Sequence, residues 1–159
     1  MYFRRENNRL VTLDPMFEQF KIFIRTKPDA DYKIIIGTDS MVFGERTRYI
    51  TAVTLQRIGN GATVFYNRVI KKTVSMPARI MQEVNLTIEI ANQVIIPKCL
   101  EEELYYPIEI HIDIGNKGKS NQLRSMALGY AKGCGFDEGV IKLKPEAFGA
   151  AKVADRYTR

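Results

Sequence analysis

The sequence predicts an α/β protein built on a mixed five-stranded sheet, with the element order β-β-β-α-β-α-β-α and helices on both faces. The first observation is the continuous apolar run "YKIIIGTD" at residues 32–39, as expected of a central strand covered on both faces. The second is a pair of β-branched and aromatic runs, 49–58 and 63–70, whose Gly-Asn-Gly connection is typical of a β-hairpin. The third is the alternation of helical and strand patterns after residue 75, which predicts later strands parallel to the first.

The N-terminal segment predicts a helix that precedes the sheet. Asp14 is a candidate cap, Pro15 suits the first helical position, and Pro28 ends the pattern. We therefore divide the chain into an N-terminal helical extension, residues 1–30, and a domain of residues 31–159.

The remaining elements follow from changes in periodicity and from Pro and Gly residues at their ends. They are a helix from a cap at Ser75 to Ile95 that Pro97 stops, a strand at 107–113, a helix from Ser120 to Ala131, a strand at 139–144 and a last helix from Pro145 to about Tyr157.

Composition indicates an ordinary soluble domain. The 159 residues, 45% hydrophobic and 26% charged, suffice for one buried core. No apolar run reaches the roughly 20 residues that cross a membrane, and the N-terminus lacks the apolar segment of a secretory signal. Cys99 and Cys134 form no C-x-x-C motif, so we expect a reducing, cytoplasmic location. The net charge of +6 favours a polyanionic partner.

Two aspartates stand at the ends of strands that we expect to be neighbours. Asp39 closes the first strand and Asp113 closes the fourth. The ends of adjacent parallel strands form the usual ligand crevice of an open α/β sheet, so the two carboxylates should lie together.

Two helical acids are expected to join them. Glu83 lies roughly 100° from the centre of the apolar stripe of its helix, at the border of the buried face. Asp155 follows an alanine-rich helix face that can approach the sheet closely. Carboxylates gathered in this way repel one another unless a cation joins them, and oxygen-only ligands suit Mg²⁺ or Mn²⁺. Two such ions about 4 Å apart would support phosphoryl displacement.

Four short motifs, in order, resemble the ribonuclease H-like superfamily, and within it the YkuK-like group of predicted RNase H-related nucleases. They are "IGTDS", "MQEVNLTIE", "HIDIG" and "AAKVADRYT". The resemblance covers about residues 31–159 and implies that Asp39, Glu83, Asp113 and Asp155 are the catalytic, metal-binding acids. It implies a nuclease fold but does not identify the substrate as RNA, DNA or a hybrid.

The loop "GNKGKS" at 115–120 is similar to a phosphate-binding P-loop but has two residues between its glycines where a P-loop has four. The shortened loop cannot wrap a triphosphate. Two interpretations stay open: a solvated turn, or a loop whose Lys117 and Lys119 contact a nucleic-acid backbone. Two further residues are also ambiguous: His111 is either a core histidine or a neighbour of the metal ligands, and Ser40 is either a turn residue or part of the metal surroundings.

The sequence thus predicts a metal-dependent nuclease that hydrolyses phosphodiester bonds with two divalent ions. The alternative is a binding module on the same fold that recruits nucleic acid or a protein and turns over nothing.

Overall fold

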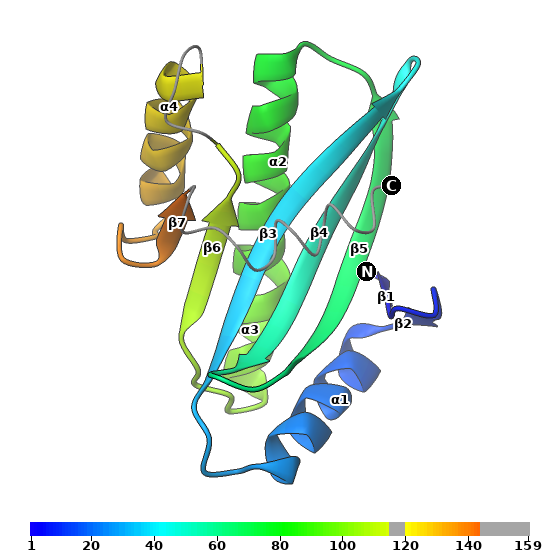
Figure 1. Cartoon of the computed structure of the whole chain (residues 1–159), viewed down its shortest axis with the longest axis vertical. Coiled ribbons are helices and arrows are strands. Elements are labelled where there is room, and N and C mark those ends of the chain that lie inside the picture. Colours follow the sequence, from blue (N-terminus) through cyan, green and yellow to red (C-terminus); the bar gives the residue numbers. More distant parts are fainter. Residues whose placement is uncertain (115–119, 144–159) are drawn as a thin grey trace.

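A single sheet of seven strands, in the order β2-β1-β5-β4-β3-β6-β7, organises the computed structural model, which describes residues 1–114 and 120–143 (Figure 1). The strands are β1 (Phe3–Arg4), β2 (Leu10–Val11), β3 (Tyr32–Phe43), β4 (Arg46–Arg57), β5 (Ala62–Lys72), β6 (Ile108–Ile112) and β7 (Ile141–Leu143). The helices are α1 (Leu13–Thr26), α2 (Met76–Ile90), the π-helical turn η1 (Ala91–Ile95), α3 (Ile96–Glu101) and α4 (Ser120–Gly133).

The predicted strand connections are confirmed. β3, β4 and β5 form an antiparallel meander, β6 pairs with β3 in parallel, and β7 pairs with β6 in parallel. In the Gly-Asn-Gly turn, Gly59 and Gly61 both have positive φ, which only glycine adopts without strain. The mixed α/β fold is therefore as the sequence predicts.

The strand count differs from the predicted five, because β1 and β2 add a short antiparallel extension at the β5 edge. Each has two residues, too few to show any periodicity in the sequence. β3 also continues past Asp39, because it stays paired with β4 as far as Phe43 opposite Arg46. A tight turn at Gly44, with φ of 63°, joins the two strands.

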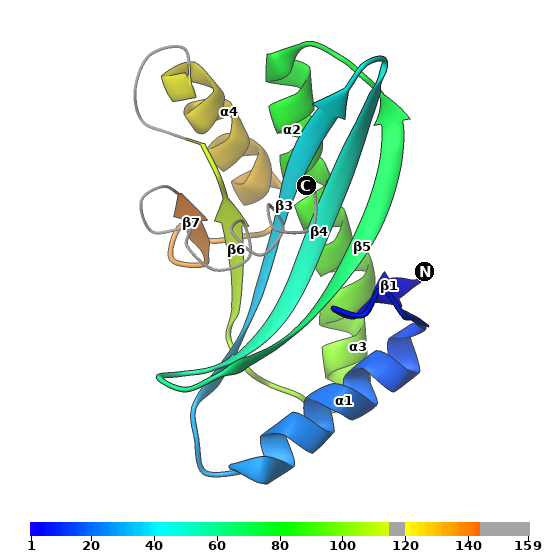
Figure 2. The same ribbon diagram turned by 45° about the vertical axis from the view of Figure 1, so that its right-hand side comes forward.

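The helices within the described ranges all pack on one face of the sheet (Figures 1 and 2). Their apolar side chains form one core with the sheet residues on that face, including Ile34 and Ile36 of β3. The opposite face has a smaller cluster around Ile35, Ile50 and Tyr66. The helix expected at 145–157 lies outside the described residues. None of the helices in the described part of the chain is long and apolar enough to cross a membrane.

The helical run after Ser75 begins as predicted but does not end at Pro97. Ser75 caps α2 by accepting a hydrogen bond from the amide of Ala78. At the far end, the amide of Ile96 donates to the carbonyl of Ala91, five residues earlier. This turn therefore holds one residue more than a turn of an α-helix. This π turn relieves the clash that a proline ring makes with the carbonyl four residues earlier, so the chain stays helical to Glu101.

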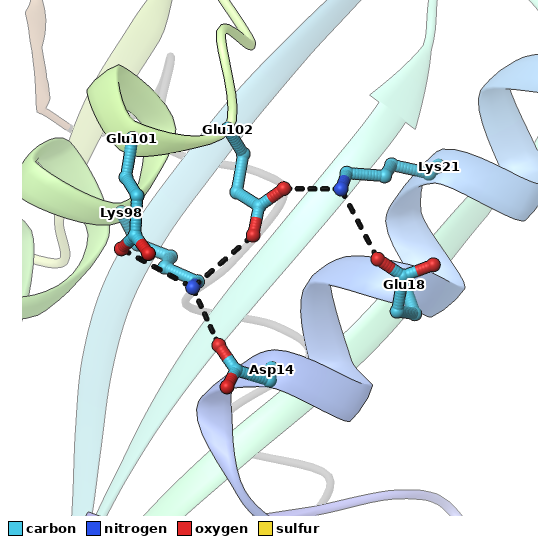
Figure 3. A network of polar contacts seen from close by, with 6 residues as sticks. All are labelled: Asp14, Glu18, Lys21, Lys98, Glu101 and Glu102. Atoms are coloured by element: carbon cyan, nitrogen blue, oxygen red, sulfur yellow. Dashed lines mark hydrogen bonds and ion pairs between the residues drawn. The ribbon is translucent and has the colours of Figure 1, made fainter.

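Helix α1 is fixed to the rest of the molecule by aromatic packing and by ion pairs. Phe20 packs edge-on against Phe65 of β5, with ring centroids 5.7 Å apart. Asp14 does not cap the helix; its carboxylate pairs with Lys98 of α3 at 2.5 Å. Figure 3 shows how Lys98 also reaches Glu101 and Glu102 of its own helical segment, while Lys21 of α1 pairs with Glu102 and Glu18.

Candidate functional site

Asp39 and Asp113 occupy matching positions on the neighbouring parallel strands β3 and β6. The last paired residues are Gly37 of β3 and His111 of β6. Asp39 lies two residues after Gly37, and Asp113 lies two residues after His111. Parallel strands lie about 4.8 Å apart, so the register brings the two carboxylates to one edge of the sheet. This is the juxtaposition that the sequence predicts.

The two aspartates face away from the described helices. Ile112 and Ile114 belong to the helix-side core, so Asp113 between them points to the other face. The same alternation applies on β3: Thr38 and Ser40 contact α2, so Asp39 between them points to the opposite face. Asp39 pairs with Ile50, a member of the small cluster on the opposite face.

The backbone at Asp39 is held by hydroxyl contacts on each side of it. The hydroxyl of Thr87 on α2 donates to that of Thr38 at 2.7 Å, and Thr38 also contacts Thr51 of β4 at 2.8 Å. Ser40 donates a hydrogen bond to Glu83 of α2. The interpretation of Ser40 as a turn residue is therefore wrong, because β3 continues through it.

Glu83 lies on the helix side of β3, with only 9% of its surface exposed. Arg79, one turn earlier on α2, donates to the Ser40 hydroxyl at 2.9 Å and lies 4.0 Å from the Glu83 carboxylate. Burial, and after it the negative charges of Asp39 and Asp113, raise the pKa of Glu83 from 4.5 to about 8 against the opposing hydrogen bond from Ser40. Glu83 is therefore close enough to both aspartates to feel their charges.

The donor chemistry of these three acids fits Mg²⁺ or Mn²⁺. They offer carboxylate oxygens only, and a cation would offset the repulsion that contributes to the raised pKa of Glu83. Among the residues that the structure describes, however, no group of three or more His, Cys, Asp or Glu side chains is spaced to hold a metal ion. Glu83 is engaged with Ser40 instead. Asp155, Lys117 and Lys119 lie outside the described residues.

His111 is buried beside the site and pairs with an acid that sequence reasoning did not select. Its Nε2 lies 2.9 Å from Glu109, which also pairs with Lys33 of β3 at 3.2 Å. Burial lowers the pKa of His111 below 6.5, although the hydrogen bond with Glu109 acts in the other direction. Sequence reasoning also missed Arg79; its position four residues before Glu83 on a helix was the available signal.

The geometry agrees with comparisons to known proteins. The Ribonuclease H-like family matches residues 15–159 of this chain. The "Uncharacterized protein YkuK" of Bacillus subtilis (strain 168) is 29% identical over 161 residues, which cover 94% of this chain and 92% of that relative. No solved structure matches the chain significantly. The chain therefore belongs to the Ribonuclease H-like family, with YkuK among its relatives.

Proposed function

We propose that the protein is a metal-dependent nuclease that hydrolyses nucleic-acid phosphodiester bonds at the Asp39–Asp113 edge of the sheet. One observation carries the proposal: two carboxylates lie just past the last paired residues of neighbouring parallel strands, and a third lies near enough for their charges to raise its pKa. The family match over residues 15–159 supports a fold of the nuclease type.

The acids have different roles in this proposal. Asp39 and Asp113 would hold the divalent ions on the sheet face opposite the described helices, and Asp155 would complete the ligand set. Two bound ions would supply positive charge to the attacking and leaving oxygens of an in-line phosphoryl displacement. Lys117 and Lys119 would contact the substrate backbone beside this edge.

Glu83 would act through its charge and its position. Buried with a pKa of about 8, it holds a proton at neutral pH when no metal ion is bound. A neighbouring divalent cation favours the ionised form of a carboxyl group, so Glu83 would release that proton when the ions bind. The hydrogen bonds of Ser40 to Glu83 and of Arg79 to Ser40 keep the side chain oriented meanwhile.

The test is a cleavage assay with labelled single-stranded, duplex, hybrid and junction substrates in Mg²⁺ or Mn²⁺. We expect cleavage of at least one substrate, loss of cleavage in EDTA, and loss of activity in Asp113→Asn and Glu83→Gln. Glu89→Gln is the matched control, because Glu89 is an exposed acid on the same helix. Activity that survives thorough chelation would overturn the mechanism.

A binding module is the second candidate, and one observation favours it. The described carboxylates do not gather into a three-acid metal group. Binding of nucleic acid without turnover on any substrate of the panel would select this function over catalysis.

A further inference from the structure

The outer half of the β3–β4–β5 meander carries a strip of cations and apolar side chains beyond Asp39. The strand register aligns three successive rows across the meander. The rows are Asp39–Ile50–Arg68, Met41–Arg48–Ile70 and Phe43–Arg46–Lys72. We call the seven residues other than Asp39 and Ile50 the ribbon strip.

The ribbon strip lies on the same face of the sheet as Asp39. The pairing of β3 with β4 and of β4 with β5 is continuous through all three rows, with no bulge that would reverse the alternation. Directly paired residues share a face, and positions two apart on one strand share it too. Lys71, between Ile70 and Lys72, therefore points to the opposite face.

The ribbon strip is strongly basic. Glu45, in the turn between β3 and β4, is the single acid in residues 40–72. Arg46, Arg68 and Lys72 are exposed, and none of them takes part in an ion pair within the described part of the chain. Their positive charge thus remains available to an anionic ligand.

Exposed apolar side chains alternate with these cations. Met41, Phe43 and Ile70 are 38%, 42% and 46% exposed. The guanidinium of Arg48 stacks over the Phe43 ring, 5.0 Å from its centroid. Single-stranded nucleic acid is bound by surfaces of this kind, where cations track the phosphates and flat or apolar groups contact unpaired bases. A duplex hides the faces of its bases, so it leaves the apolar half of the strip unused.

We propose that the ribbon strip binds a single-stranded segment of nucleic acid that leads away from the Asp39–Asp113 edge. Successive rows are about 7 Å apart along the strands, comparable to the phosphate spacing of an extended single strand, and Arg68 lies about 10 Å across the sheet from Asp39. The strip would thus hold the strand on one side of the edge where the proposed function places the scissile phosphate. The inference rests on that function for its choice of ligand.

The experiment compares Arg46→Gln/Lys72→Gln with Lys71→Gln. Lys71 is the matched control, because it is an exposed lysine on the same strand that faces the other way. Binding of a labelled single-stranded oligonucleotide is followed by fluorescence anisotropy in EDTA over a salt series. We expect the double variant to bind more weakly. Its slope of log affinity against log salt should be less negative than that of wild type by about 1.4, the value for two phosphate contacts on a single strand. Lys71→Gln should retain the wild-type slope.

The outcomes separate this inference from the proposed function. An unchanged slope in the double variant, or an equal fall in Lys71→Gln, would overturn the ribbon strip even if the protein cleaves nucleic acid. The expected slope change in a protein that cleaves nothing would support the strip and count against the nuclease. If the double variant lost as much affinity for a blunt duplex as for the single strand, the assignment to single-stranded nucleic acid would be overturned.

Discussion

Glu83 carries a carboxyl group that the fold keeps largely out of water. Its pKa of about 8 reflects burial first, opposed by the hydrogen bond from Ser40, and then the charges of Asp39 and Asp113. The folded protein therefore holds a proton on Glu83 over a pH range in which the unfolded chain has lost it. This proton makes stability depend on pH.

We expect the contribution of Glu83 to lower the free energy of unfolding of the metal-free protein as pH rises from about 4.5 to about 8. In this range the folded state binds more protons than the unfolded state, so raising the pH favours unfolding. Glu83→Gln should remove this component, and Glu89→Gln should keep it. Urea unfolding in EDTA at several pH values measures it. His111 acts in the opposite direction below pH 6.5, so the difference between wild type and variant isolates Glu83. An identical pH profile in Glu83→Gln would contradict the assignment.

At the residue scale, part of the candidate site was predictable. The adjacency of Asp39 and Asp113 follows from strand order and parallel pairing, both of which periodicity indicates. The placement of Glu83 at the border of a buried helix face was also deducible. Its contact with Ser40 was not, because that contact depends on how α2 is rotated against β3 and on the length of β3.

Helix α3 illustrates how one side chain can join two elements. The Lys98 side chain is 7% exposed, and its ammonium group contacts carboxylates of α1 and of its own helical segment (Figure 3). These contacts with Asp14, Glu102 and Glu101 raise the pKa of Lys98 above its usual value. Lys98 thus remains charged and connects α1 to the main core.

We expect Lys98→Met to lower the melting temperature, because it leaves three carboxylates close together without their shared cation. The deficit should shrink at high salt, since Asp14 and Glu101 are exposed and their repulsion is screened. Lys132→Met is the control: Lys132 pairs with Glu138 on the surface, so its loss should change stability by less than about 1 kcal/mol. Thermal melts at low and high salt test both variants. Equal deficits in the two proteins would show that Lys98 has no special role.

At the element scale, the limits of prediction have identifiable causes. The long, strongly patterned elements β3, β4, β5 and α2 are visible as runs or stripes in the sequence. The continuation of the helix past Pro97 is not, because it requires a π turn whose residues, Ala91–Ile95, show no special composition. The extension of β3 past Asp39 is a property of the pairing with β4, which lies outside any local window.

At the scale of the whole molecule, ion binding would link the candidate site to the stability of the fold. Asp39→Asn removes one of the charges that repel each other and keeps the side-chain shape. In EDTA, this variant should melt at the same temperature as wild type or higher.

Wild type should gain stability with Mg²⁺ or Mn²⁺, by about 2.7 kcal/mol at a hundredfold excess over Kd. Asp39→Asn should lose most of that gain, and Asp137→Asn, at an exposed acid after α4, should keep it. Melting curves in EDTA and over a metal titration measure both effects. Destabilisation of metal-free Asp39→Asn with an intact metal response would assign Asp39 to the scaffold.

The order and direction of the long strands were more predictable than the short strands at the β5 edge of the sheet. Three strands in a meander followed by strands reached through helices leave few arrangements, and the right-handed crossover rule selects among them. The two-residue strands β1 and β2 depend on where the N-terminus packs against β5, at Arg4 opposite Tyr66. That placement is a long-range contact without a local sequence signal.

The alternation of faces along Thr38, Asp39 and Ser40 restricts how the length of β3 can change. Thr38 and Ser40 contact α2, and Asp39 between them points to the face opposite the described helices. A residue inserted or lost within the paired part of the strand would exchange the two faces, so the carboxylate would turn toward the helix and a hydroxyl would take its place. A substitution at one position alters one contact, whereas a change of length alters all of them at once. Insertions are therefore better accommodated at the turn at Gly44 and Glu45, where the strands end, than at any position before it.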